Sequence, residues 1–246
     1  SVDQFVTSKV LGLKPEQVTI NTVLSGGSFG RRATGDADWT AELAHIVKAI
    51  EGRAPVHLVW TREDDIRGAY YRSMALHRIR AGLDADGNLS GWHHKIVCKS
   101  LAIGTPFEKA MVHEGVDHTS VEGVADTPYG ISDLAVESFN AEAPMKVLWW
   151  RSVGHTHTAQ AMETMMDELA HAAGKDAVEF RLGLLAEQPR DAAVLKLAAE
   201  KANWGEKLPE GKGRGIACHR SFNSYVAMVA EVTTRDGETK VDRVVA

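Results

Sequence analysis

The chain has 246 residues, 44% of them hydrophobic and 25% charged, which is the composition of a globular protein with one large domain or two modest ones. The formal net charge of -5 argues against broad nucleic-acid binding, although local basic pairs can still bind anions. No apolar run approaches the roughly 20 residues that cross a bilayer. Cys98 and Cys218 lie far apart without a Cys-x-x-Cys spacing, so the sequence encodes neither an iron–sulfur cluster nor a structural zinc site.

The N-terminal part of the chain mixes helix-type and strand-type patterns. Residues 2–11 are predicted to form a helix, and residues 17–24 alternate apolar and polar side chains as a strand does. A second helix is predicted over 38–50, where apolar residues recur at helical spacing before Gly52. The apolar run 56–60 is typical of a buried strand. These elements predict a mixed α/β fold.

A glycine-rich loop separates the first predicted strand from the second helix. Its sequence is Gly26-Gly27-Ser28-Phe29-Gly30-Arg31-Arg32. Glycines permit positive φ and close approach by a ligand, and guanidinium groups pair bidentately with phosphate oxygens. The loop therefore indicates an anionic, phosphate-bearing ligand. A simple tight turn, a core role for Phe29 and a solvated arginine pair are the competing interpretations.

The middle of the chain contains one strong hairpin signal. Segments 76–83 and 89–99 flank Asp84-Ala85-Asp86-Gly87-Asn88, which predicts two antiparallel strands. Arg62-Glu63-Asp64-Asp65 is predicted to be a polar turn. The stretch 100–145 has little periodicity and is predicted to form surface turns, of the kind that are often functional or covered by a partner.

Regular patterns return after residue 145. The run 145–150 is predicted to be a strand that leads into a second glycine-containing turn, Arg151-Ser152-Val153-Gly154-His155. Three amphipathic helices follow, the last of them with Asp191 as its expected N-cap, and then a linker and a small β segment. Their expected bounds are 158–173, 178–185 and 191–203 for the helices, 209–214 for the linker, and 215–218, 224–233 and 239–245 for the strands.

Other polar clusters have less specific patterns. His155 and His157 form a His-x-His pair that could bind a metal, but without a third ligand at zinc-like spacing the start of a helix is the better interpretation. Glu163, Asp167 and Glu168 are typical of a solvated helix face before they are typical of paired catalytic carboxylates. Arg151 could bind an anion or form an ion pair with one of these carboxylates.

Two strand-to-turn segments thus each carry glycine and arginine, and together they resemble a known family. Gly-Gly-Ser-Phe-Gly-Arg-Arg is similar to the Gly-Gly-Gly-Phe-Gly-Arg-Arg loop of the molybdopterin-binding large subunit of the xanthine dehydrogenase/oxidase family. Trp150-Arg151-Ser152-Val153-Gly154-His155 resembles the second loop of its isoquinoline 1-oxidoreductase β-subunit and bacterial aldehyde dehydrogenase branch. Glu163, Asp167-Glu168-Leu169-Ala170 and Phe180-Arg181 follow in the expected order, so the resemblance spans about residues 18–186.

The resemblance implies a fold, a cofactor and partners. The fold is α/β with mixed sheets and packed helices, of the molybdenum-cofactor-binding domain type, and the cofactor is molybdenum–molybdopterin. The implied partners are the remainder of the large subunit, a [2Fe-2S] small subunit and, as a candidate electron acceptor, a cytochrome c. The implied cofactor-binding residues are Gly26, Gly27, Ser28, Phe29, Gly30, Arg31 and Arg151.

The sequence departs from the family pattern in two ways. Ser28 replaces a glycine, which would cost on the order of 1 kcal/mol if that position needs a positive φ. The family also uses a downstream glutamate, after a Gly-x-Gly motif, as the base that activates a molybdenum-bound hydroxyl, and no Gly-x-Gly-Glu occurs after residue 200. We therefore assign no catalytic base and no metal ligand in this chain.

Both ends of the chain fall inside predicted elements, so we expect a piece of a longer polypeptide. We expect residues 1–208 to be part of a molybdopterin-binding domain and residues 209–246 to start a further β segment. The expected function is part of a molybdenum hydroxylase that oxidises an aldehyde or an N-heteroaromatic compound with water as oxygen source, and the isolated chain is expected to be inactive and cofactor-free. The alternatives are a noncatalytic module that binds a nucleotide or another phosphate ligand through Gly26–Arg32, and a structural interface domain.

Overall fold

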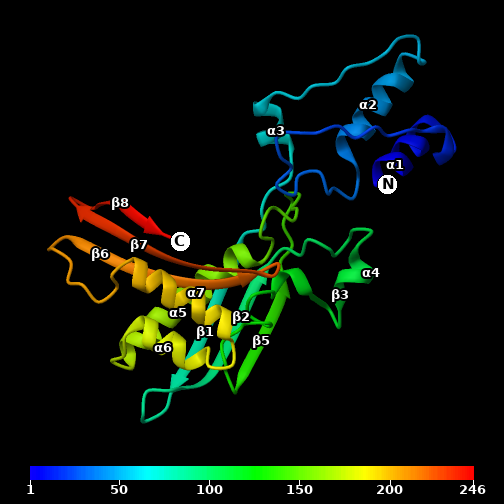
Figure 1. Ribbon diagram of the computed structural model, residues 1–246. Helices are drawn as coiled ribbons and strands as arrows, with labels where there is room; N and C mark the ends of the chain where they lie inside the picture. The colour runs from blue at the N-terminus through cyan, green and yellow to red at the C-terminus, as the bar shows by residue number, and fades with distance from the viewer. The chain divides into compact units, whose positions relative to one another are not determined.

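The computed structural model describes residues 1–246, and their contacts group them into two units (Figure 1). Unit 1 comprises Ser1–Met74, Lys99–Asp117 and Asn140–Val153. Unit 2 comprises Ala75–Cys98, His118–Phe139 and Gly154–Ala246. The mixed α/β fold predicted from the sequence is confirmed. The domain boundary that the sequence predicts after residue 208 stays a prediction.

Unit 1 is built around two helices that pack against each other, α1 (Val2–Leu11) and α2 (Asp38–Ala49), and both confirm their predictions. The Ser1 hydroxyl caps the start of α1, and Gly12 ends it in the left-handed conformation that glycine adopts without strain. Across the interface the Thr40 hydroxyl donates to Asp3 at 3.2 Å, and Lys48 Nζ donates to the Val10 carbonyl at 2.9 Å.

The remaining elements of unit 1 are short. The predicted polar turn at 62–65 is wrong, because these residues begin helix α3 (Arg62–Gly68). Thr61 and Asp64 form a capping box, in which the Thr61 side chain accepts from the Asp64 NH and the Asp64 side chain accepts from the Thr61 NH. The others are a 3₁₀ turn at Pro15–Gln17, α4 (Glu108–Met111), β3 (Val112–His113) and β4 (Val116–Asp117).

Three strands predicted in unit 1 are wrong. Residues 18–24 and 55–60 are extended but pair with no strand. The segment 145–150 makes only one isolated parallel bridge, between Val147 and Tyr71. A strand is defined by its hydrogen-bonded neighbour, which a local sequence pattern cannot supply.

Unit 2 contains two three-stranded sheets and three helices. The first sheet has the order β1-β2-β5, from β1 (Ala75–Leu83), β2 (Leu89–Cys98) and β5 (Leu134–Asn140). The predicted hairpin is confirmed, and the Asp84 carboxylate accepts from the main-chain NH of Asp86 and Asn88 to close it. The stretch 100–145 contains, besides its turns, elements that the sequence did not predict: β5, β3, β4, α4 and a 3₁₀ turn at His118–Ser120.

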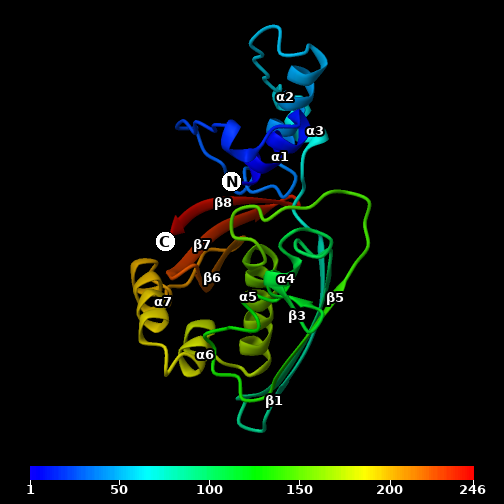
Figure 2. The ribbon, with the colours of Figure 1, turned by 90° about the vertical axis from the view of Figure 1, so that its right-hand side faces the viewer.

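The second sheet of unit 2 follows the helices in the chain. Figure 2 shows β6 (Lys212–Ser221), β7 (Ser224–Arg235) and β8 (Glu238–Val245), which pair in that order. The helices are α5 (His155–Ala172), α6 (Ala177–Leu184) and α7 (Pro189–Lys201), and α7 packs on β6 and β7. Asp191 is not the N-cap of α7: Gln188 occupies that position, and the buried Asp191 carboxylate lies 3.6 Å from Arg220 Nη1.

A buried ion pair links the helices of unit 2 to its second sheet. The fully buried Arg181 donates from Nε to Glu163 at 3.0 Å and from Nη1 to Asp167 at 2.8 Å. Glu163 also accepts from the Tyr129 hydroxyl and the Cys218 main-chain NH, while burial raises its pKa despite the facing arginine. Of the three carboxylates on this helix, Glu163 is therefore part of the core, whereas Asp167 and Glu168 lie on the exposed face that the sequence indicated.

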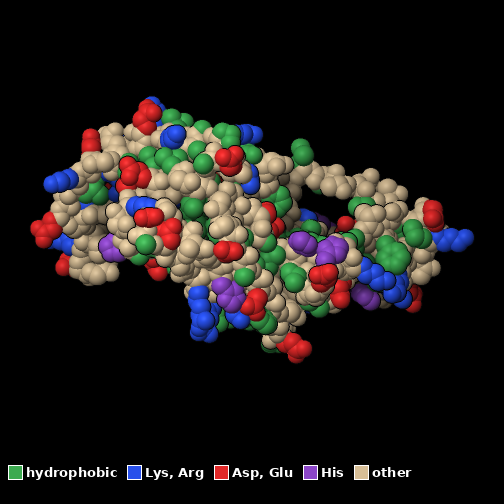
Figure 3. Space-filling model, turned by 90° about the horizontal axis from the view of Figure 1, so that it is seen from below, with side chains coloured by type: hydrophobic (Ala, Val, Ile, Leu, Met, Phe, Trp, Pro, Cys, Tyr) green, Lys and Arg blue, Asp and Glu red, His purple; other side chains and the backbone are tan.

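The face in Figure 3 shows acidic and basic side chains interspersed, with hydrophobic side chains between them. No helix of the protein combines the length and the apolar character that a membrane crossing requires.

Candidate functional site

The two glycine-containing loops meet within unit 1. The main-chain NH of Arg151 donates to the carbonyl of Phe29 at 2.8 Å. A Cβ atom on Gly30 would collide with the carbonyl oxygen of Trp149, so only glycine allows the two main chains to approach this closely. The two loops are therefore adjacent, although neither of them follows a paired strand.

The main-chain conformation of the first loop explains its glycines. Gly27 and Gly30 have φ angles of 123° and 102°, which side chains with a Cβ rarely adopt. Phe29 also lies in the left-handed region, with φ 53°, and its ring is 57% exposed. Ser28 does not have a positive φ, and its Oγ accepts from the Arg32 NH at 3.2 Å. The serine therefore fits the loop without the backbone cost that a positive φ would impose.

A concavity of about 340 Å³ opens over this loop. Two exposed arginines line it: the Arg32 guanidinium carbon lies 3.6 Å from the centre of the Trp39 ring, and Arg62 Nη1 lies 3.1 Å from Asp65 Oδ2. Main chain that is almost bare of side chains forms part of its wall, as an anion site requires. The lining residues are Ser25, Gly26, Gly27, Ser28, Phe29, Arg31, Arg32, Trp39, Arg62, Asp65 and Trp150.

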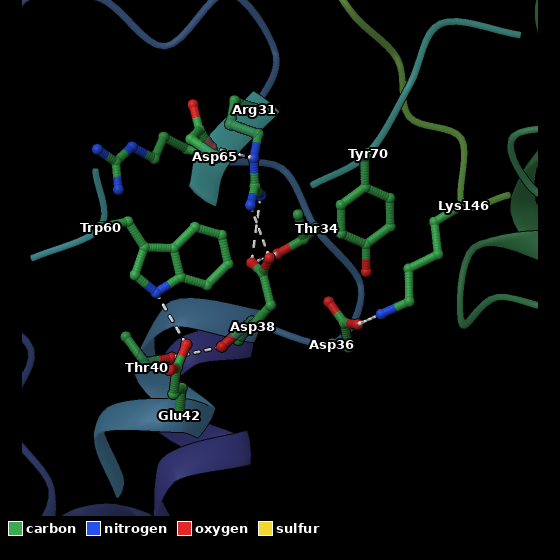
Figure 4. A network of polar contacts seen from close by, with 12 residues as sticks. Arg31, Thr34, Asp36, Asp38, Thr40, Glu42, Trp60, Asp65, Tyr70 and Lys146 are labelled. Atoms are coloured by element: carbon green, nitrogen blue, oxygen red, sulfur yellow. Dashed lines mark hydrogen bonds and ion pairs between the residues drawn. The ribbon is translucent and has the colours of Figure 1, made fainter. Parts of the chain in front are cut away.

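Arg31 lies at the base of the loop and is buried. Its Nη2 lies 2.7 Å from Asp38 Oδ2, and its Nε lies 3.3 Å from Asp65 Oδ1 (Figure 4). The guanidinium carbon is 4.2 Å from the centre of the Trp39 ring. Burial by itself lowers the pKa of Arg31, but the two carboxylates outweigh it and raise that pKa above its ordinary value. The Arg31 guanidinium thus joins the loop to α2 and α3.

A second polar network joins the loops. Lys146 Nζ lies 3.2 Å from Asp36 Oδ2, and Figure 4 shows the Tyr70 side chain beside this pair. Burial and the neighbouring carboxylate of Asp36 raise the pKa of the Tyr70 hydroxyl. The indole NH of Trp149 donates to the Ala33 carbonyl at 2.9 Å, and that of Trp150 donates to the Tyr70 carbonyl at 3.2 Å. These contacts fix the second loop against the first.

The second loop stores conformational strain. Ser152 and Val153 have φ angles of 71° and 44°, and a β-branched residue such as valine is a clear outlier there. A hydrogen bond of 2.7 Å from the Val153 NH to the Trp150 carbonyl closes the turn. Arg151 is exposed, and its carbonyl accepts from Arg72 Nη2 at 3.1 Å. Trp150 is the residue of this loop that lines the concavity.

Sequence reasoning placed the glycine loop and Arg151 together and missed the surroundings. Trp39, Arg62, Asp65 and Trp150 complete the concavity. The capping box from Thr61 to Asp64 could have shown that Arg62 begins a helix. Nothing local in the sequence brings that helix beside residue 31, because the contact depends on the tertiary fold.

The His-x-His pair divides between two partners in unit 2. His155 Nδ1 lies 2.8 Å from His219 Nε2, whereas His157 Nδ1 lies 3.0 Å from His77 Nε2. His77 Nδ1 in turn lies 2.8 Å from Nε2 of the fully buried His94. Burial, with a smaller contribution from His77, lowers the pKa of His94 to about 4. No cluster of three or more histidine, cysteine or carboxylate side chains in the chain is arranged to bind a metal ion.

Curated relatives match almost the whole chain. It is 28% identical over 236 residues to the isoquinoline 1-oxidoreductase subunit beta of Brevundimonas diminuta, covering 94% of this chain and 30% of that protein. It is 32% identical over 254 residues to the membrane-bound aldehyde dehydrogenase [pyrroloquinoline-quinone] of Gluconacetobacter polyoxogenes, covering 92% of this chain and 32% of that protein. The chain thus spans about a third of the length of these relatives.

Solved structures show the same fold. Quinoline 2-oxidoreductase from Pseudomonas putida 86 superposes with a TM-score of 0.69 at 19% identity, over 88% of this chain and 30% of that one. Aldehyde oxidoreductase from Desulfovibrio gigas superposes with a TM-score of 0.59 at 20% identity, over 87% and 25%. The family model described as the molybdopterin cofactor-binding domain matches residues 1–183. The chain therefore belongs to the molybdopterin cofactor-binding domain family, and its cofactor is molybdenum–molybdopterin.

Proposed function

We propose that this chain is part of the large subunit of a molybdenum hydroxylase and that its concavity over Gly26–Arg32 faces the cofactor. The observation that carries the proposal is the hydrogen bond from the Arg151 NH to the Phe29 carbonyl, which joins the two loops of the family pattern. A contact between them is what a shared ligand would require.

The residues present fit a phosphate-bearing group. Arg32 and Arg62 can pair with phosphate oxygens at the rim, while the glycines leave main chain accessible between them. A side chain at Gly27 would be strained at φ 123°, and its Cβ would lie 2.7 Å from the Phe29 ring, so glycine fits this position best. When bound, the cofactor supplies the redox chemistry of the molybdenum centre. The residues of this chain bind it, orient it and limit the access of water.

Within the proposal, Arg31 and Arg151 have different roles. Arg31 is committed to Asp38 and Asp65, so we assign it to positioning the loop rather than to direct contact with phosphate. Arg151 is exposed beside the loop junction and is proposed to border the cofactor. Phe29, strained and 57% exposed, is proposed to pack against it.

The proposed reaction is oxidation of an aldehyde or an N-heteroaromatic compound, with water as oxygen source and electrons passed to a [2Fe-2S] partner. The names of the relatives, an isoquinoline oxidoreductase subunit and an aldehyde dehydrogenase, support this substrate range. A cytochrome c is the proposed onward acceptor. We place the catalytic base in a part of the large subunit outside these residues, so the chain alone should not turn over.

Metal and pterin analysis tests the proposal. The full-length large subunit, purified with its partner, should contain molybdenum and a pterin and should reduce a dye when given an aldehyde or quinoline. The 246-residue chain should show no such turnover. Turnover by the chain alone would contradict the placement of the base. Release of a nucleotide without molybdenum would favour a noncatalytic phosphate-binding module, for which the arginine-rimmed concavity is also suited.

A further inference from the structure

Two extended segments of unit 1 have strand-type sequences without strand partners. Residues 19–25 and 54–60 belong to no sheet, and their main-chain groups make no hydrogen bond to another main-chain group. Main-chain NH and carbonyl groups in such runs are normally paired within sheets. These segments are therefore open templates for an additional strand.

Their side chains are also exposed in a way that edge strands usually avoid. Val23 is 81% exposed, Leu24 103% and Val59 70%. Between 56 and 60 the burial alternates, with His57 and Val59 outward and the residues on either side of them half-buried. This alternation is that of a strand with one face on a core and one uncovered. Exposed apolar side chains beside unpaired main chain indicate a surface that another polypeptide covers.

Both segments lead directly into the concavity. The first continues into Ser25 and Gly26, and the second continues through Thr61 into Arg62. Figure 1 shows the second segment running into α3. A strand added to either segment would therefore fix one wall of the concavity.

We propose that residues 19–24 and 55–60 are the open edge of an incomplete β-sheet, completed by strands from a part of the same large subunit outside these 246 residues. The relatives are about three times as long as the matched region. A large subunit of that length has enough further residues to supply the missing strands. Each run has six residues, which is the length of an ordinary strand. The proposal rests on membership of the family and is independent of whether the concavity binds the cofactor.

Hydrogen exchange tests the pairing directly. We compare the 246-residue chain with the same residues in the full-length large subunit, prepared both with and without cofactor. Amides 19–24 and 56–60 should exchange fast in the chain and at least about 100-fold more slowly in both full-length preparations. The β1–β2 hairpin should exchange alike in all three samples. Protection only in the cofactor-loaded preparation would overturn the proposal and leave the proposed function standing.

A matched pair of variants shows whether the protection comes from a strand. Val23→Pro removes a main-chain donor, whereas Val23→Thr keeps it. In the full-length subunit the proline variant should lose protection over 19–24 and the threonine variant should keep it. In the 246-residue chain both should unfold at the same temperature, because the Val23 NH is unpaired there. Concentration-dependent protection of the chain alone, with dimers seen by light scattering, would assign the edge to a second copy and overturn the proposed source.

Discussion

Phe29 and Arg151, 122 positions apart in the sequence, are joined by a main-chain hydrogen bond of 2.8 Å. The Phe29 carbonyl accepts from the Arg151 NH while Gly30 packs against the Trp149 carbonyl. Main-chain contacts thus add to the side-chain contacts of Trp149 and Lys146 in holding the two strained loops together. Their relative position depends on glycine at position 30.

Gly30→Ala should separate the loops. The added methyl group collides with the Trp149 carbonyl, and alanine is strained at φ 102°. We expect a loss of stability of about 2 kcal/mol or more, measured by urea unfolding followed through tryptophan fluorescence. Gly215→Ala, where a Cβ meets nothing within 4 Å, is the control and should be near neutral. Equal stability of the two variants would contradict the tight crossing.

Arg31→Gln should destabilise unit 1. It leaves the carboxylates of Asp38 and Asp65, whose side chains are 16% and 23% exposed, without their buried cation. We expect a loss of about 2–4 kcal/mol in the same unfolding measurement. Arg62→Gln removes an arginine that is 76% exposed and should cost less than about 1 kcal/mol. A similar cost for both variants would argue against the positioning role of Arg31.

Stability should fall as the pH falls from about 6.5 to about 4. The pKa of His94 is lowered to about 4, so the unfolded chain binds its proton more readily than the folded one. The stability that neutral His94 contributes is fully present above the pKa that this histidine has in the unfolded chain. It is lost as the pH falls through the pKa of His94 in the folded protein. The half-buried His219, which lies beside His155, has its pKa lowered to about 4, chiefly by burial, and acts in the same direction. His94→Gln should flatten the profile measured by thermal unfolding, and an unchanged slope would contradict this cause.

Arg151→Ala in the full-length subunit should lower cofactor content. An arginine that faces an anion makes hydrogen bonds that alanine cannot replace, while alanine keeps the main-chain NH that bonds to the Phe29 carbonyl. Molybdenum content is measured per subunit, and the unfolding temperature is recorded alongside. Full occupancy with reduced stability would instead identify Arg151 as a structural residue.

Local signals in the sequence account for part of the fold. The periodicity and the nearby Gly52 located α2, and the Asp-Gly-Asn turn located the β1–β2 hairpin, because their stabilising contacts lie close in sequence. The strand-type runs 17–24 and 145–150 failed as predictions because pairing depends on distant neighbours. The capping box of Thr61 and Asp64 is a local pattern that indicates the start of a helix, so α3 could have been predicted in place of a turn at Arg62-Glu63-Asp64-Asp65.

In the candidate site too, local motifs could be predicted from the sequence and tertiary contacts could not. The glycine loop and Arg151 were found from their motifs, and their contact follows from the resemblance to the family. The ion pairs of Arg31 with Asp38 and Asp65 were not found, because residues 31 and 65 meet only when α3 folds back beside the loop. In a sequence, an arginine next to glycines indicates anion binding. Only the fold shows that the guanidinium of Arg31 is already paired with two carboxylates of the chain itself.

The central claim is that the arginine-rimmed concavity over Gly26–Arg32 faces the cofactor, and the most direct measurement is the pterin and molybdenum content of a double variant. Arg32→Ala with Arg62→Ala in the full-length large subunit removes both exposed guanidinium groups from the rim. Arg235→Ala, on the β7–β8 hairpin with 88% of its side chain exposed, is the control. We predict that the double variant loses most of its pterin and molybdenum at an unchanged unfolding temperature, while the control keeps both. Full cofactor content in the double variant would contradict the account.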